Sequence, residues 1–167
     1  DKQYIEHWMP DVVVLATGAT PKPLGDAEII GNMPVLNAFD VLVDKVKTGQ
    51  NVVVLGGRYI GMECALKLAE EGKKVSLLAR GDFGKRIIAR IRGRMFEELV
   101  EKGIYLYAHT VPYRVTSKHV EGIHGGSLFS IPADTVVLGI GTVPDKTLEP
   151  VLQELGIPYC CVGDCDH

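Results

Sequence analysis

A glycine-rich turn between two apolar stretches carries the residues best suited to ligand chemistry. The turn consists of Gly56, Gly57, Arg58, Tyr59, Ile60 and Gly61, and it follows the apolar run 52–55 and precedes a helix-forming segment. Glycine permits a sharp turn, and the N-terminus of a helix offers unpaired N–H groups and a partial positive charge to an anion. The pattern predicts a site for the pyrophosphate of a dinucleotide.

The turn departs from the pattern G-x-G-x-x-G at one position. Gly56 and Gly61 occupy the outer glycine positions, whereas Arg58 replaces the middle glycine, which allows close approach of the backbone to the pyrophosphate. We expect the Arg58 side chain to swing away from the turn and pair with a phosphate. The alternative is that Arg58 crowds the turn and weakens or closes the site.

Apolar runs and turn residues define the elements that must position this turn. The run 52–55, the following helix and the strand 74–79 form a βαβ unit, since continuous apolar runs indicate strands buried on both faces. A short helix at 37–46 is expected to be capped by Asn37, and a longer helix within 86–102 to end at Gly103. Further strands are predicted at 11–16, 104–107, 111–116, 119–123, 127–131 and 134–140. The fold class is therefore α/β, with a Rossmann-like doubly wound parallel sheet and a small antiparallel β-meander from residues 111–131.

The end of the strand 74–79, the second strand of the βαβ unit, bears on the choice of cofactor. NAD-binding units of this type carry an acid there for the ribose hydroxyls, but this chain has Ala79 followed by Arg80. Residues 80–94 contain six basic side chains against one acid, Asp82. The 2′-phosphate of NADPH suits such a cationic segment, so NADPH is favoured over NADH, with contacts expected from Arg80 and from Lys85 or Arg86.

Composition and charge exclude several classes of function. The net charge of −3 and the pI near 6.0 provide no general attraction to nucleic acid or anionic membranes, and no apolar run is long enough to span a bilayer. The four cysteines form no C-x-x-C pair, and the five histidines lack metal-ligand spacing, so we predict neither a metal site nor a thioredoxin-like redox pair. A cytoplasmic location is expected. No residue stands out as a general acid, general base or nucleophile.

Four motifs in order resemble the two-dinucleotide-binding-domain flavoproteins of the pyridine nucleotide-disulfide oxidoreductase superfamily. They are the strand at 11–16 ending in Thr17 and Gly18, the segment 56–63, the segment 139–144 that includes Gly141, and Val162 followed by Gly163 and Asp164. Within the superfamily, the chain is most similar to the C-terminal region of NADH:flavin oxidoreductases of the old yellow enzyme and 2-enoate reductase type.

The resemblance implies an NAD(P)H-binding domain at 31–142, inserted between FAD-domain-like flanks at 1–30 and 143–167. It implies that the sequence is a fragment of a longer flavoprotein that holds FAD, with the remaining FAD and substrate domains as partners. Such a module positions nicotinamide for hydride transfer to the flavin, and Tyr59 and Glu63 match positions at the nicotinamide end. The dinucleotide sites implied on the flanks include Thr17, Gly18, Gly163 and Asp164.

Two other functions remain open from the sequence. One is a reductase that borrows flavin from a partner chain, which bound flavin in an absorbance spectrum would favour. The other is a non-catalytic nucleotide-sensing or interaction domain in which Arg58 has closed the phosphate site. Failure to bind either nicotinamide dinucleotide would favour that second alternative.

Overall fold

The chain folds into two compact units, seen in a computed structural model that describes residues 2–85 and 87–166. The inner unit is Pro23–Gly141, and the outer unit combines the described residues up to Lys22 with those from Thr142 onward. The expected boundaries were 31 and 142. The inner unit begins earlier because β3 (Glu28–Ile29) pairs with β8 (Thr110–Val115) inside it.

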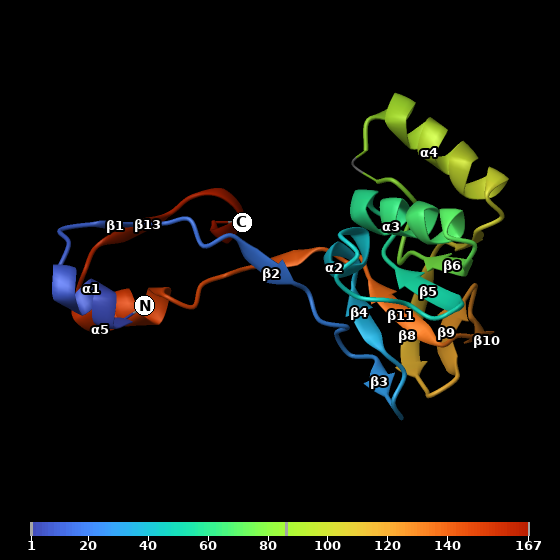
Figure 1. Cartoon of the computed structure of the whole chain (residues 1–167), viewed down its shortest axis with the longest axis horizontal. Helices are drawn as coiled ribbons and strands as arrows, with labels where there is room; N and C mark the ends of the chain where they lie inside the picture. The colour runs from blue at the N-terminus through green and yellow to red at the C-terminus, as the bar shows by residue number, and fades with distance from the viewer. Residues whose placement is uncertain (1, 86, 167) are drawn as a thin grey trace. The chain divides into compact units, whose positions relative to one another are not determined.

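A five-stranded parallel sheet forms the centre of the inner unit (Figure 1). Its order is β4 (Val35–Asn37), β11 (Thr135–Leu138), β5 (Asn51–Leu55), β6 (Lys74–Leu78) and β7 (Tyr105–Tyr107). Successive residues of a strand face opposite sides of its sheet, and the residues of β5 from Val52 onward are all buried. This burial on both faces explains the uninterrupted apolar run.

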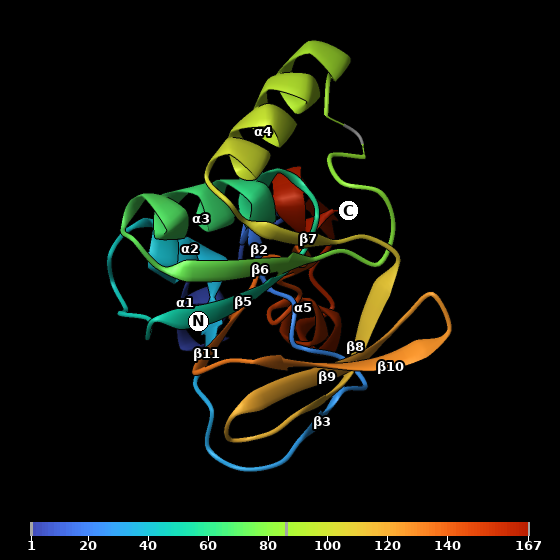
Figure 2. The same cartoon turned by 90° about the vertical axis from the view of Figure 1, so that its right-hand side faces the viewer.

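Helices cover one face of this sheet, as Figure 2 shows. They are α2 (Ala38–Leu42), α3 (Tyr59–Glu70) and α4 (Ala89–Glu101), and their buried side chains join those of Val52 and Val54 in one apolar cluster. The side-chain oxygen of Asn37 accepts a hydrogen bond of 3.0 Å from the N–H of Phe39. The predicted cap is confirmed, and it sets the start of α2.

A second sheet, made of three antiparallel strands and the parallel edge strand β3, covers the opposite face (Figure 2). It has the order β10 (Ser127–Pro132), β9 (His119–His124), β8 and β3, and the first three strands form the predicted meander. Its buried residues pack with Val53, Leu55, Leu78 and Val136 of the parallel sheet. The Rossmann-like α/β class is confirmed, but the meander, rather than a second layer of helices, covers this face.

The outer unit is built from both parts of the chain that flank the inner unit. It contains α1 (Lys2–Trp8), β1 (Val13–Leu15) parallel to β13 (Tyr159–Cys161), and α5 (Glu149–Leu155), followed by the 3₁₀ helix η1 (Gly163–Cys165). Leu15, Leu152, Ile157 and Cys165 form its apolar core.

The glycine and prolines of the segment 17–23 are typical of a turn that leads into a linker, but part of this segment forms a strand. Residues Ala19–Pro21 form β2, which pairs antiparallel with β12 (Thr142–Pro144). The partner strand lies more than a hundred residues away in the sequence, so local turn chemistry could not reveal the pairing. Proline is tolerated here because each strand of a two-stranded pair has an open edge.

Candidate dinucleotide site

Three glycines at the carboxyl ends of β5 and β11 pack together without room for side chains. A Cβ on Gly56 would collide with the carbonyl oxygen of Gly139, and a Cβ on Gly61 would collide with the carbonyl oxygen of Gly56. A Cβ on Gly139 would lie 2.7 Å from the Cα of Gly61. Gly56 also has a φ of +133°, which only glycine adopts readily. The turn, the first turn of α3 and the end of β11 are thus in backbone contact.

The N-terminus of α3 is free of any side-chain cap. Arg58 occupies the N-cap position with an extended backbone, and its side chain makes no capping hydrogen bond. The N–H groups of the first helical turn therefore remain available to an anion. The Arg58 side chain is exposed, and among the described residues no carboxylate pairs with it. This arrangement offers the features that suit a pyrophosphate: backbone donors, the helix dipole and an exposed cation.

The loop after β6 is attached to this turn. The N–H of Gly84 donates a hydrogen bond of 2.7 Å to the carbonyl oxygen of Gly57. A Cβ on Gly57 would lie 2.5 Å from the Cβ of Ala79 and 3.0 Å from the ring of Phe83, so Gly57 is a glycine because the loop packs on it. The sequence analysis did not single out Phe83, whose only signal is an apolar residue within a charged loop.

Two side chains on the first turns of α3 form a hydrogen-bonded pair. The hydroxyl of Tyr59 bonds to the carboxylate of Glu63, and this bond raises the pKa of the tyrosine above its ordinary value. Tyr59 keeps 45% of its surface exposed, whereas Ile60 packs on the apolar cluster beneath the helix. Tyr59 and Glu63 thus lie together on the first turns of α3, and Ile60 anchors the helix.

The predicted cationic end of the site follows β6 directly. Arg80 and Lys85 are exposed, and within the part of the chain that the structure describes neither pairs with an acid. Arg86 lies outside the described residues. Gly141, at the end of the inner unit, has a φ of +99° and open space where a side chain would be. Gly139, rather than Gly141, is the glycine of this segment that contacts the turn.

The remaining predicted residues lie in the outer unit. The hydroxyl of Thr17 donates to the carbonyl oxygen of Asp145 at 2.6 Å, and the N–H of Asp145 donates to the carbonyl oxygen of Gly18 at 2.9 Å. Gly163, with a φ of +70°, begins η1, and Asp164 follows with its side chain exposed. The structure therefore groups the predicted residues into one set on the inner unit and a second set on the outer unit.

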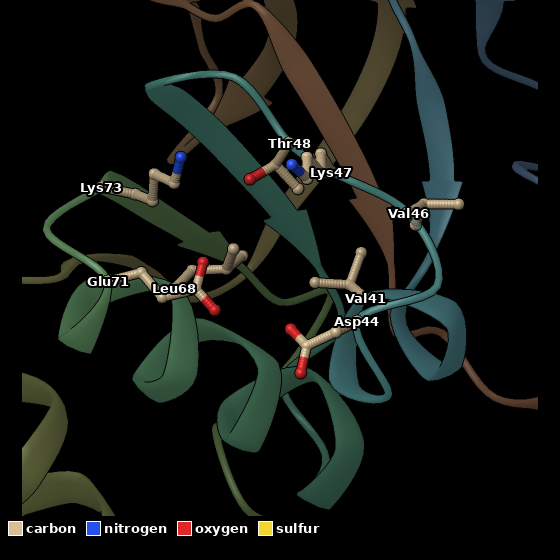
Figure 3. A pocket seen from close by; sticks show the side chains of 8 residues that line it. All are labelled: Val41, Asp44, Val46, Lys47, Thr48, Leu68, Glu71 and Lys73. Atoms are coloured by element: carbon tan, nitrogen blue, oxygen red, sulfur yellow. The ribbon is translucent and has the colours of Figure 1, made fainter.

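A hollow of about 260 Å³ on the inner unit lies away from the glycine turn. Figure 3 shows the side chains that line it, among them Thr48, Lys73 and Glu71. Lys73 immediately precedes β6, so this hollow is at the amino ends of the parallel strands. Ligands of open α/β sheets bind outside the carboxyl ends, so this hollow is separate from the candidate dinucleotide site.

In the described ranges, 2–85 and 87–166, no group of three or more His, Cys, Asp or Glu side chains could hold a metal ion. The same residues include no helix with the length and apolar character needed to cross a bilayer.

Comparison with known proteins agrees with this geometry. The family model described as pyridine nucleotide-disulphide oxidoreductase matches residues 5–160. The chain belongs to this family. The family recognised from four short motifs is thus confirmed, and a pyridine nucleotide-disulphide oxidoreductase domain is part of an enzyme that uses NAD(P)H and FAD.

Relatives of the domain are reductases and oxidases. The chain is 31% identical to bilirubin reductase of Mediterraneibacter gnavus, over 95% of this chain and 25% of that protein. It is 33% identical to NADH oxidase of Thermoanaerobacter brockii, over 98% of this chain and 26% of that protein. The structure of a 2-naphthoyl-CoA reductase complex matches with a TM-score of 0.82 and 28% identity, over 98% of this chain and 25% of that one. The chain therefore spans about a quarter of the length of these relatives.

Proposed function

We propose that the inner unit binds NAD(P)H and positions its nicotinamide for hydride transfer to FAD within a longer flavin oxidoreductase. The observation that carries this proposal is the packing of Gly56, Gly61 and Gly139 next to the uncapped N-terminus of α3. Side chains are excluded where the backbone must approach a phosphate, and the helix directs N–H groups toward the same place.

Different residues of this chain would bind different parts of the dinucleotide. The α3 N-terminus and Arg58 would hold the pyrophosphate, and Arg80 with Lys85 and Arg86 would hold a 2′-phosphate, which favours NADPH over NADH. Tyr59 and Glu63, joined by their hydrogen bond, would flank the nicotinamide. When bound, the nicotinamide supplies a hydride, and these residues fix where it is presented.

The outer unit is proposed to be part of the FAD domain. Its two strands β1 and β13 are followed by Thr17–Gly18 and Gly163–Asp164, at the same carboxyl edge of a parallel pair. Because ligands of parallel sheets bind at that edge, these residues are the ones that would contact the flavin dinucleotide. The remaining FAD and substrate domains would be the partners of this chain.

Calorimetric titration of the chain with NADPH and NADH tests the proposal. We expect binding, and we expect Arg58→Glu to weaken it about tenfold or more, because a carboxylate would replace a phosphate-pairing cation. Lys118→Glu is the matched control, since it makes the same charge change at an exposed turn of the meander. Both side chains are exposed, so neither change should unfold the chain.

The other outcomes separate the alternatives. Absence of binding by the unaltered chain would contradict the proposal and favour a sensing or interaction domain. Tighter binding by Arg58→Gly, which restores the middle glycine of the pattern, would show that the arginine crowds the turn. Flavin absorbance that appears only with a partner chain would favour a reductase that borrows its flavin.

A further inference from the structure

A turn from a distant part of the chain lies beside the cationic end of the site. The N–H of Ala79 donates to the carbonyl oxygen of Tyr107 at 2.9 Å, and the N–H of Thr110 donates to the carbonyl oxygen of Ala79 at 2.9 Å. Ala79 is therefore bracketed by the two ends of the β7–β8 connection, which contains His109. Because Arg80 follows Ala79 directly, His109 is placed next to the segment expected to meet a 2′-phosphate.

His109 bonds to the acid of that segment. Its Nε2 lies 3.0 Å from Oδ1 of Asp82, and both side chains are largely exposed. The backbone of His109 has a φ of +51°, a conformation that non-glycine residues adopt uncommonly and that the bracketing hydrogen bonds hold in place. His109 and Asp82 thus meet because the β7–β8 connection is held beside Ala79, and not because they are close in the sequence.

The positive charge available to a phosphate at this site depends on which side chain pairs with the Asp82 carboxylate. Asp82 is two residues from Arg80 and three from Lys85, and a carboxylate so close could pair with either. It pairs with His109 instead, and Arg80 and Lys85 have no acidic partner among the residues described. A carboxylate released from His109 would compete with phosphate oxygens for these cations.

We propose that His109 is a positioning residue for dinucleotide preference: by holding Asp82, it leaves Arg80 and Lys85 open to the 2′-phosphate of NADPH. This inference rests on the proposed function, because it requires that the inner unit bind a nicotinamide dinucleotide. NADH lacks the 2′-phosphate, so its affinity does not depend on these two cations.

A double-mutant cycle on the full chain tests the inference, with NADPH and NADH titrated at one pH and one ionic strength. We expect His109→Ala to lower the affinity for NADPH about fivefold and to change that for NADH less than about twofold. Removing the freed carboxylate in His109→Ala/Asp82→Asn should restore the affinity for NADPH. His109→Gln should retain it, because the amide can still donate to Asp82. His7→Ala, an exposed histidine in the outer unit, is the control.

The possible results separate a failure of this inference from a failure of the proposed function. If the unaltered chain binds neither dinucleotide, the proposed function fails and the inference with it. If the unaltered chain binds NADPH but His109→Ala lowers the affinities for NADPH and NADH equally, only the inference is overturned. Failure of Asp82→Asn to restore binding in the double variant also overturns the inference alone, since it would show that the freed carboxylate is not the cause.

Discussion

Gly61 lies against Gly56 so closely that a Cβ on Gly61 would overlap the Gly56 carbonyl oxygen. This contact joins the first turn of α3 to the end of β5. The colliding atom belongs to the backbone, so it cannot rotate away as a flexible side chain could. The position of the helix terminus relative to the strand therefore depends on the absence of a single methyl group.

Replacement of Gly61 by alanine should consequently harm both stability and binding. We expect Gly61→Ala to lower the free energy of unfolding by about 2 kcal/mol, measured by urea denaturation, and to weaken NADPH binding at least about tenfold. Gly93→Ala is the control, because Gly93 lies within α4 with open space around it. That change should be neutral or stabilise the chain by up to about 1 kcal/mol. An unaltered denaturation midpoint for Gly61→Ala would show that the turn can relax.

Arg80 should determine the preference between the two dinucleotides. We expect Arg80→Ala to weaken NADPH binding about tenfold while NADH binding stays within about twofold, since only NADPH carries the 2′-phosphate. Calorimetry with both dinucleotides measures the ratio. Arg90→Ala removes the same charge from an exposed position on α4. Equal losses from Arg80→Ala and Arg90→Ala would mean that a diffuse positive field, rather than a specific contact, attracts the phosphate.

Asp134 connects the starts of β11 and β5. Its carboxylate accepts hydrogen bonds from the N–H groups of Asn51 at 2.8 Å and Gln50 at 3.0 Å, and from the hydroxyl of Thr135 at 3.1 Å. Burial by itself would raise the pKa of Asp134, but these donors outweigh it and hold the pKa below its ordinary value of 3.8. The ionised form is therefore the one that stabilises the sheet.

Removal of this carboxylate should lower stability in a pH-dependent way. We expect Asp134→Ala to cost about 1–2 kcal/mol at pH 7, because two backbone N–H groups lose their acceptor. The folded-state pKa is lowered, so the contribution of Asp134 is complete above the ordinary pKa and is lost as the pH falls through the folded-state pKa. The difference between the two proteins in urea denaturation should thus shrink below about pH 4. Asp26→Ala, at an exposed turn, should show no such dependence.

The cysteines should differ sharply in reactivity. Cys64 is fully buried on α3, and burial raises the pKa of its thiol to about 12. Cys160 is exposed on β13. At pH 8, iodoacetamide should modify Cys160 within minutes and leave Cys64 unmodified until the inner unit unfolds, because the thiolate is the reactive form. Peptide mass spectrometry after alkylation, with a urea-unfolded sample as the reference, measures both. Early modification of Cys64 would reveal local opening of α3.

The central elements could be predicted because their signals are local. β5 appears as an apolar run buried on both faces, and Asn37 has the side chain that caps the following helix. By contrast, α1 has only seven residues and none of them is fully buried, so its helical signal in the sequence is weak. β2 depends entirely on β12, a partner that local sequence does not indicate.

The site shows the same division between local and distant signals. Gly56 and Gly61 belong to a recognisable pattern, whereas the close approach of Gly139 depends on which strand lies beside β5 in the sheet. His109 looked like an ordinary loop histidine, because its bond to Asp82 joins residues 27 positions apart in the chain. The spacing of residues in the sequence can thus locate the glycine turn, but which side chains surround it depends on the order of the strands.

The pairing of β2 with β12 gives the inner unit adjacent ends. Pro21 lies opposite Thr142, so the chain enters the segment Pro23–Gly141 and leaves it at neighbouring points. A segment whose two ends are adjacent can be exchanged between proteins by joining the chain at only two neighbouring positions. The paired strands β2 and β12 of the outer unit stay unchanged in such an exchange. Exchange of this segment with that of a relative should transfer dinucleotide preference as one trait, without redesign of the outer unit.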